Sequence, residues 1–143
     1  MNRKKPRRNC KQCGREVNQV EALYCSGECQ HLFQHADYIR RWKAGEVTGD
    51  VSGMTISRHI RRYLIERDGE QCSLCGWARR HPITGKVPLE VDHVNGVHTD
   101  HSEPNLRLVC PNCHSLTPTF RALNRGNGRE LRRRKLQKLI TPT

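Results

Sequence analysis

The sequence predicts a small α+β protein whose fold is stapled by metal ions. Three observations lead to this prediction. Eight cysteines occur in four close pairs, only 34% of the 143 residues are hydrophobic and 5% aromatic, and strand-like alternation is interspersed with helical periodicity. The length fits one ordinary domain or two small ones. Because small domains with so little apolar material are rarely stabilised by burial alone, a staple is expected, and the cysteines offer one.

The cysteine spacing favours zinc over disulfides. The basic N-terminus is not followed by an apolar run, so no secretory signal is expected, and intracellular thiols are kept reduced. Paired C-x2-C units in such a chain are typical of Zn²⁺ ligands. We therefore expect two structural zinc ions, held by two quartets: Cys10, Cys13, Cys25 and Cys29, and Cys72, Cys75, Cys110 and Cys113.

The formal charge of +12 points to a polyanionic partner. Four thiolates around one Zn²⁺ carry −2, so two such sites reduce +12 to +8, which is still strongly basic. Nucleic acid is the first candidate, and a basic surface that serves only solubility is the alternative. No apolar stretch approaches membrane-spanning length, so we expect a soluble, cytoplasmic protein without a membrane partner.

The N-terminal third divides into three segments. Residues 1–9 form a basic tail, and residues 10–44 hold the first cysteine quartet followed by a helix. Gly45 suits the end of this helix, and residues 45–55 are rich in glycine and β-branched residues, which predicts a linker. The apolar residues of the helix approximate one face: Leu32, Phe33, Ala36, Ile39 and Trp42.

Residues 56–124 are expected to form the main domain, with a basic tail at residues 125–143. A helix is predicted from about Ser57 to Arg67 by its apolar spacing. Residues 87–93 alternate like a strand, a polar loop covers residues 94–104, and residues 105–109 form a second strand. Pro111 suits the first turn of a helix, and residues 129–140 can form an amphipathic helix.

A chemically distinctive set of residues lies between the two cysteine pairs of the second quartet and directly after them. Asp92 and His93 end the first predicted strand, and His114 directly follows Cys113. In an ideal strand Asp92 and His93 point to opposite faces, so a shared pocket requires a bend. A carboxylate oxygen and an imidazole nitrogen suit a catalytic divalent ion. The alternatives are a surface Asp-His pair, His114 as a zinc ligand, and Asn105 as a plain turn residue after Pro104.

Two cysteine pairs, Asp-His, Asn and His in this order resemble the HNH endonuclease family. The motifs are VDHVNGVHTD and NLRLVCPNCHSLTPTFR, within residues 72–121. The resemblance implies a ββα-metal (His-Me) nuclease domain, stapled by the second cysteine quartet, that hydrolyses phosphodiester bonds in DNA. The segment 101–104 departs from the family, which usually has a more regular segment with an apolar residue before the asparagine.

The resemblance also implies roles for single residues. Asp92 and His114 would hold the catalytic ion, Mg²⁺ or Mn²⁺, and His93 would act as general base. Asn105 would orient the loop that carries His93 through amide hydrogen bonds. His98 and His101 are expected to be solvated loop residues, with phosphate contact or an accessory ligand as the alternative.

The N-terminal quartet, with its YCSGEC motif, resembles the treble-clef-like fingers that accompany phage HNH proteins. It could contact DNA or stabilise the N-terminus, and it suggests a phage or prophage origin in a bacterial host. The arginines of residues 129–134 could clamp the DNA backbone or form a solvated helix face. The candidate DNA-binding residues are Arg3, Lys4, Lys5, Arg7, Arg8, Arg121, Arg125, Arg129, Arg132, Arg133 and Arg134.

The functional expectation is a nicking or homing-type endonuclease, with a monomer favoured. A single Asp-His…Asn…His set can attack one phosphate per encounter. The alternatives are a non-catalytic zinc protein that binds nucleic acid, and a nuclease subunit of a phage DNA-processing assembly.

Overall fold

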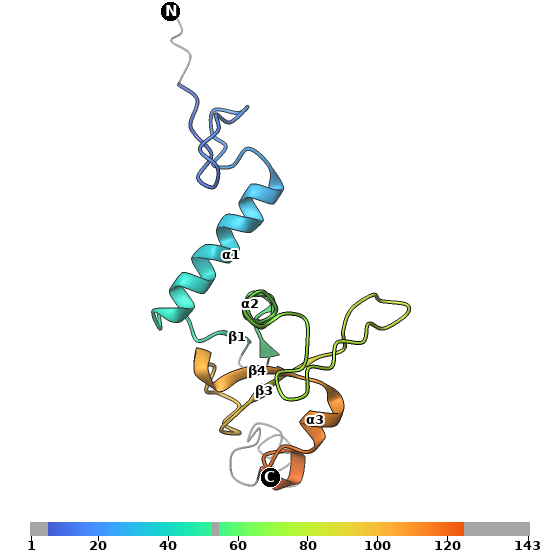
Figure 1. The fold of residues 1–143 in the computed structure, drawn as a ribbon. Helices are drawn as coiled ribbons and strands as arrows, with labels where there is room; N and C mark the ends of the chain where they lie inside the picture. The colour runs from blue at the N-terminus through green and yellow to red at the C-terminus, as the bar shows by residue number, and fades with distance from the viewer. Residues whose placement is uncertain (1–5, 53–54, 125–143) are drawn as a thin grey trace, which may run out of the picture. The chain divides into compact units, whose positions relative to one another are not determined.

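The computed structural model describes residues 6–52 and 55–124, and the expected amphipathic helix at residues 129–140 lies outside them. The chain forms two compact units, one ending at Val47 and one beginning at Thr48 (Figure 1). Each unit contains one cysteine quartet. Among the described residues, no helix combines the length and the apolar character needed to cross a membrane.

The first unit is a cysteine-rich loop followed by α1, Gly27–Lys43, which confirms the helix expected after Cys25. The Ser26 side chain caps its start by accepting a hydrogen bond from the Cys29 amide at 3.2 Å. The helix ends at Ala44, and Gly45 follows with a φ of +74°, the left-handed conformation that commonly terminates helices. A small core of Cys10, Val17 and Cys29 packs against Ala22 and Tyr24.

The second unit begins with a short hairpin that the sequence did not predict. Strands β1, Asp50–Val51, and β2, Thr55–Ile56, pair antiparallel within and just beyond the segment interpreted as a linker. The β-branched residues noted there favour extended structure, which accounts for the hairpin. Helix α2, Arg58–Asp68, follows as predicted, capped by Ser57 and ended by Gly69 at a φ of +82°.

The centre of the second unit is the antiparallel pair β3, Glu90–His93, and β4, Leu106–Val109. Strand β3 is shorter than the predicted 87–93 strand, although Val87 and Leu89 just before it are buried. Helix α2 packs on β4, and helix α3, Pro111–Ser115, packs on β3. The largest buried side chains of this unit come from α2 and β4: Ile60, Leu64, Leu106, Leu108 and Val109.

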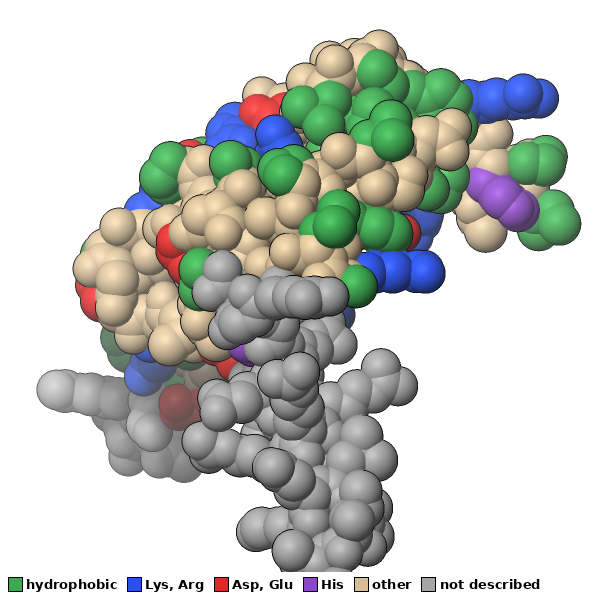
Figure 2. Space-filling view, turned by 90° about the horizontal axis from the view of Figure 1, so that it is seen from below, with side chains coloured by type: hydrophobic (Ala, Val, Ile, Leu, Met, Phe, Trp, Pro, Cys, Tyr) green, Lys and Arg blue, Asp and Glu red, His purple; other side chains and the backbone are tan. Residues whose placement is uncertain are grey.

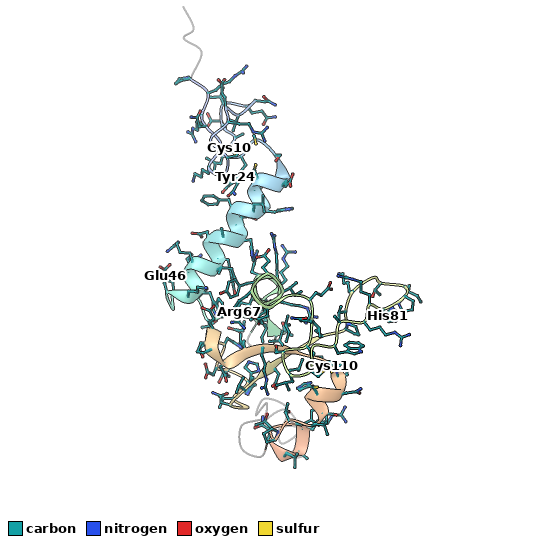
Figure 3. The ribbon with its side chains drawn as sticks, viewed as in Figure 1. Cys10, Tyr24, Glu46, Arg67, His81 and Cys110 are labelled. Carbon is teal, nitrogen blue, oxygen red and sulfur yellow. The ribbon has the colours of Figure 1, made fainter. Side chains whose placement is uncertain are left out.

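This architecture is a small α+β fold with two two-stranded antiparallel sheets in the described residues. The order β3, β4, α3 brings the end of one strand next to the start of a helix. Because β4 runs directly into α3 through Cys110, any metal bound by that cysteine ties the hairpin to the helix (Figure 3). The candidate site lies at this junction.

Candidate active site and metal centres

The second cysteine quartet is assembled from two distant segments. Cys72 and Cys75 lie in a tight turn closed by a 2.8 Å hydrogen bond from the Gly76 amide to the Cys72 carbonyl. Cys110 and Cys113 lie at the first turn of α3, where the Cys113 amide donates to the Cys110 sulfur at 3.4 Å. All four sulfur atoms lie within 4.8 Å of one another, with Cys75 and Cys110 at 3.9 Å. Tetrahedral Zn–S bonds of about 2.3 Å place sulfurs ~3.8 Å apart, so the quartet fits Zn²⁺.

The proton affinities of these thiols show why a cation suits the quartet. Burial opposes ionisation of Cys72, but backbone amide donors, led by that of Cys110, lower its pKa to about 6. The hydrogen bond to Cys75 raises the pKa of Cys113 to about 12, because that thiol lies beside thiolate neighbours. The quartet alone therefore retains protons that a dication would displace.

The first quartet has similar geometry and one additional partner. The Cys25 sulfur lies 3.5 Å from the sulfurs of both Cys13 and Cys29. Arg15 donates to the sulfur of Cys13 at 3.4 Å and to that of Cys25 at 3.8 Å, and it lowers the pKa of Cys13 to about 6. A guanidinium beside thiolates offsets part of the −2 charge of a Zn(Cys)₄ centre. Both quartets could hold zinc, as expected from their spacing.

Asp92 and His93 line the same cavity although they are adjacent in β3. The cavity has a volume of about 460 Å³, and His114 lines it as well. Its walls also include β2, α2 and the loop after β3. Asp92 is 4% exposed, whereas His93 is half-buried. Three of the four residues that the motif singled out therefore meet around one space.

Arg107 fixes one oxygen of Asp92. It lies directly opposite Asp92 in the register of β3 and β4. Its Nε and Nη2 atoms each donate to Asp92 Oδ2 at 2.8 Å. The other carboxylate oxygen, Oδ1, is turned toward His114, whose Nε2 lies 3.8 Å away.

Glu90 fixes the ring of His114 from the opposite side. Its carboxylate contacts His114 Nδ1, and the Phe120 ring packs edge-on with a centroid separation of 5.3 Å. A proton on Nδ1, shared with Glu90, leaves the lone pair of Nε2 toward Asp92. Ligands of one divalent ion lie about 3–4 Å apart, so Asp92 Oδ1 and His114 Nε2 are spaced as two neighbouring ligands. A carboxylate behind a histidine is also the usual outer partner of a metal-binding imidazole.

His93 lies against a second histidine. Its Nε2 is 3.0 Å from Nδ1 of His101, and the ring centroids are 5.1 Å apart. Burial, and next the charge of a protonated His101, lower the pKa of His93 below the usual 6.5. His101 is itself partly buried, so the expectation of a simply solvated loop residue is wrong for it. His98 lines the same cavity.

The Asn105 side chain stabilises the loop between β3 and β4 through hydrogen bonds. It is 7% exposed, its Oδ1 accepts from the Asn95 amide at 2.9 Å, and its Nδ2 donates to the Asp100 carbonyl at 2.7 Å. Asp100 in turn accepts from both the hydroxyl and the amide of Ser102, which lower its pKa. The amide hydrogen bonds expected of Asn105 are therefore present. Asn105 is also the last residue of the short 3₁₀ turn Glu103–Asn105. The alternative interpretation of Asn105 as a turn residue therefore describes part of its role.

The described residues include three of the candidate DNA-binding residues. Arg7 and Arg8 form ion pairs with Glu16 at 3.3 Å and with Glu21 at 3.8 Å. Arg121 stacks over the Phe120 ring at 5.0 Å, near the cavity. Arg7 and Arg8 belong to the first unit, and Arg121 belongs to the second. The other eight lie outside the described residues: Arg3, Lys4, Lys5, Arg125, Arg129, Arg132, Arg133 and Arg134.

Sequence reasoning missed Glu90 and Arg107. A signal existed for Glu90, because it precedes Asp92 by two residues and therefore shares its face of the strand. No comparable signal existed for Arg107. Its position opposite Asp92 depends on the register of a hairpin whose connecting loop does not follow a standard short turn.

The chain is similar in sequence to a known phage nuclease. The chain is 41% identical over 81 residues to an H-N-H endonuclease of Escherichia phage T5, F-TflIV. The similarity covers 52% of this chain and 34% of the phage protein, so the chain spans about a third of that relative's length. The resemblance to HNH endonucleases that the motifs indicated is thus confirmed. No family model and no solved structure matches the chain.

Proposed function

We propose that the chain is a metal-dependent endonuclease of the HNH type that hydrolyses phosphodiester bonds in DNA, with β3, β4 and α3 as its ββα-metal element. The observation that carries this proposal is the arrangement of Asp92 and His114. Their facing atoms are 3.8 Å apart, and each side chain is fixed from behind, by Arg107 and Glu90. The similarity to a phage nuclease supports the same chemistry.

Asp92 and His114 would hold the catalytic ion, Mg²⁺ or Mn²⁺. One carboxylate oxygen and one imidazole nitrogen leave most positions of such an ion open to phosphate and water, and the cavity of about 460 Å³ has room for both. When bound, the ion supplies positive charge to the scissile phosphate and the leaving oxygen. Arg107 keeps the carboxylate in place, and Glu90 keeps the imidazole in the tautomer that can bind a metal.

His93 would remove the proton from the attacking water. A general base must have a free lone pair at the working pH, and the lowered pKa of His93 keeps its ring neutral near pH 7. The contact with His101 fixes the ring plane from one side. Asn105 would hold the backbone that follows His93, because its side chain bonds to Asn95 and Asp100 in the loop after β3.

Each chain contains one such set, so we propose that it nicks one strand per encounter. The N-terminal quartet would provide a second structural zinc site, and the basic ends would contact the DNA backbone. The same site fits a homing role or a role within a phage DNA-processing assembly. Either role would change the DNA target and leave the proposed cleavage chemistry unchanged.

The test is cleavage of supercoiled plasmid by the zinc-loaded chain. We expect nicking with Mg²⁺ or Mn²⁺ and none when Ca²⁺ replaces them. Ca²⁺ is used in place of a chelator because a chelator would also remove the structural zinc. His93→Ala should lose roughly 10²–10⁴-fold in rate while binding DNA normally. His114→Ala should instead raise the Mg²⁺ concentration needed for half-maximal rate.

The matched control is His59→Ala, a histidine of α2 outside the cavity lining. It should cleave like the unmodified chain. If the zinc-loaded chain binds plasmid but does not cut it with any of these ions, the chain is a zinc-dependent DNA-binding protein, and the proposal is wrong. Near-normal cleavage by His93→Ala at neutral pH would remove His93 from the mechanism.

A further inference from the structure

A basic loop precedes strand β3. It runs from residue 78 to residue 86, between the Cys72–Cys75 turn and β3, and is here called the 78–86 loop. Figures 1 and 3 show it standing away from the β3–β4 hairpin, with His81 labelled on it. Every residue of the loop is exposed, whereas Val87 and Leu89, which follow it, are 3% and 4% exposed.

The loop is held in one shape by its own hydrogen bonds. The His81 amide donates to the Lys86 carbonyl at 2.8 Å, and the Gly85 amide donates back to the His81 carbonyl at 2.9 Å. The His81 ring accepts from the amides of Ile83 and Thr84 at 3.2 and 3.3 Å. Gly85 adopts a φ of +65°, which a side chain would strain.

The base of the loop is fixed to the rest of the unit. Arg80 donates to the Gly85 carbonyl at 2.8 Å and forms an ion pair with Glu70 at 2.6 Å. Glu70 also accepts from the Val87 amide at 3.2 Å. The loop is therefore a preformed projection, and ordering it on binding costs little conformational entropy.

Positive charge gathers on this projection. The sequence has no Asp or Glu from residue 71 to residue 89, a stretch that contains Arg79, Arg80 and Lys86. Residues 10–124 together carry 14 cations and 13 carboxylates, so outside this stretch 11 cations face 13 carboxylates. Because Arg80 is paired with Glu70, Arg79 and Lys86 supply the available positive charge of the loop, on a nearly neutral body.

The tip of the loop carries an apolar side chain. Ile83 is 88% exposed, more than any other exposed large hydrophobic residue of the described chain. In Figure 2 the projection at the right edge ends in hydrophobic side chains beside a histidine. A single exposed aliphatic residue is ordinary on a protein surface. Proteins that bind the minor groove insert apolar side chains such as isoleucine between base steps, with basic side chains beside them.

We propose that the 78–86 loop is a second DNA contact, in which Arg79 and Lys86 bind phosphates and Ile83 inserts between base pairs of duplex DNA. The inference takes its ligand, duplex DNA, from the proposed function. Because the chain passes from the loop directly into β3, contact at the loop fixes where along the duplex the cavity with Asp92 and His93 lies.

The experiment measures binding and bending of a random-sequence 30-base-pair duplex by the full zinc-loaded chain carrying His93→Ala, which leaves the DNA intact. Arg79→Ala with Lys86→Ala should reduce the magnitude of the salt slope of log K by about 1.8, since each phosphate contact contributes about 0.9. The matched control, Arg58→Ala with Arg62→Ala on α2, should leave the slope unchanged.

Ile83→Ser should keep the salt slope, weaken binding roughly 10-fold and abolish a bend of at least about 20°, measured by energy transfer between dyes at the duplex ends. Leu74→Ser, an exposed aliphatic residue 50% accessible in the same unit, is its control and should retain the bend. An unbent duplex with the parent chain, or a salt slope unchanged by the double arginine–lysine variant, overturns the proposal.

Plasmid cleavage separates this inference from the proposed function. In the first outcome, the chain with His93 intact cuts plasmid, and the loop variants bind and bend DNA as strongly as the chain with an unchanged loop. The loop proposal then fails and the nuclease proposal stands. If the loop variants lose bending while no form of the chain cuts DNA, the nuclease proposal fails and the loop proposal stands.

Discussion

At the residue scale, the candidate site depends on the buried carboxylate of Asp92 and on its hydrogen bonds with Arg107. Asp92 is 4% exposed, and Arg107 occupies one of its oxygens with two donors at 2.8 Å. A buried carboxylate without a cation is costly, whereas the pair as a whole contributes little net stability. Arg107 therefore makes it possible to keep an ionised carboxylate at the site before any metal arrives.

Arg107→Met tests this role. Removing the guanidinium leaves the buried Asp92 carboxylate without its two hydrogen bonds from Arg107, so we expect the second unit to lose roughly 3–5 kcal/mol of stability at pH 7. Adding Asp92→Asn should recover much of that loss, because the uncompensated charge disappears. Denaturant unfolding of the zinc-loaded single and double variants measures both. Equal stabilities of Arg107→Met with and without Asp92→Asn would contradict the explanation.

The pH dependence of cleavage tests the His93–His101 contact. As the proposed general base, His93 would act in its neutral form, and its pKa is lowered by burial and then by His101. The rate should therefore rise with pH through a midpoint below about 6.5 and be flat above it. His101→Asn removes a cationic neighbour, so the pKa of His93 should rise and the midpoint should move to higher pH. An unmoved or lowered midpoint would show that His101 does not set the protonation of His93.

At the element scale, a zinc ion in the second cysteine quartet would substitute for a larger core. Strand β3 and strand β4 have four residues each, and α3 has five, too few to be stable alone. Cys110 and Cys113 fix the first turn of α3, and His114 is the next residue. Structural zinc contributes on the order of 10–16 kcal/mol in small domains, enough to position that turn.

Cys110→Ser should therefore disrupt the second unit and abolish cleavage, whereas Cys10→Ser should disrupt the first unit alone. The prediction follows from the two compact units, each with its own quartet. Native mass spectrometry should give two zinc ions for the parent chain and one for each variant, and plasmid nicking should survive in Cys10→Ser. Loss of both zinc ions from either variant would show that the units do not fold independently.

At the scale of the whole molecule, the positive charge sits at the two ends of the sequence. Residues 1–9 carry five cations, and residues 125–143 carry seven cations and one carboxylate, so these segments hold +11 of the +12. Most nonspecific attraction to DNA should come from them, because it scales with the phosphates neutralised.

Deleting residues 1–9 and 125–143 should strongly flatten the salt dependence of DNA binding, by about 0.9 in slope for each phosphate that the shortened chain no longer neutralises. The remaining chain should still nick plasmid at low salt, since Asp92, His93, Asn105 and His114 all remain. Binding titrations at several salt concentrations give the slope. A slope equal to that of the full chain would mean that the ends are ordinary solvated charge.

One catalytic set per chain predicts the order of plasmid products. Open-circular DNA should appear first and linear DNA later, because a second cut requires a second encounter. A time course at limiting protein distinguishes this from paired cutting. Linear product from the earliest time points, without an open-circular intermediate, would indicate two chains acting together on the DNA.

The sequence by itself determined the parts of this protein that are local in the chain. Ser57 caps the start of α2, Gly69 caps its end, and Pro111 begins α3. These features and both cysteine quartets could be assigned because capping and ligand spacing act over a few residues. The order of Asp92, His93, Asn105 and His114 along the chain likewise carries the resemblance to HNH endonucleases.

The tertiary structure alone decided which side chains contact those residues. Arg107 faces Asp92 through strand register, Glu90 contacts His114 across the junction with α3, and His101 lies on His93 through the folding of the 94–104 loop. It also decided that the 78–86 loop is a rigid projection. The three side-chain pairs join residues between 8 and 24 positions apart, and no local preference encodes the backbone path that closes such distances.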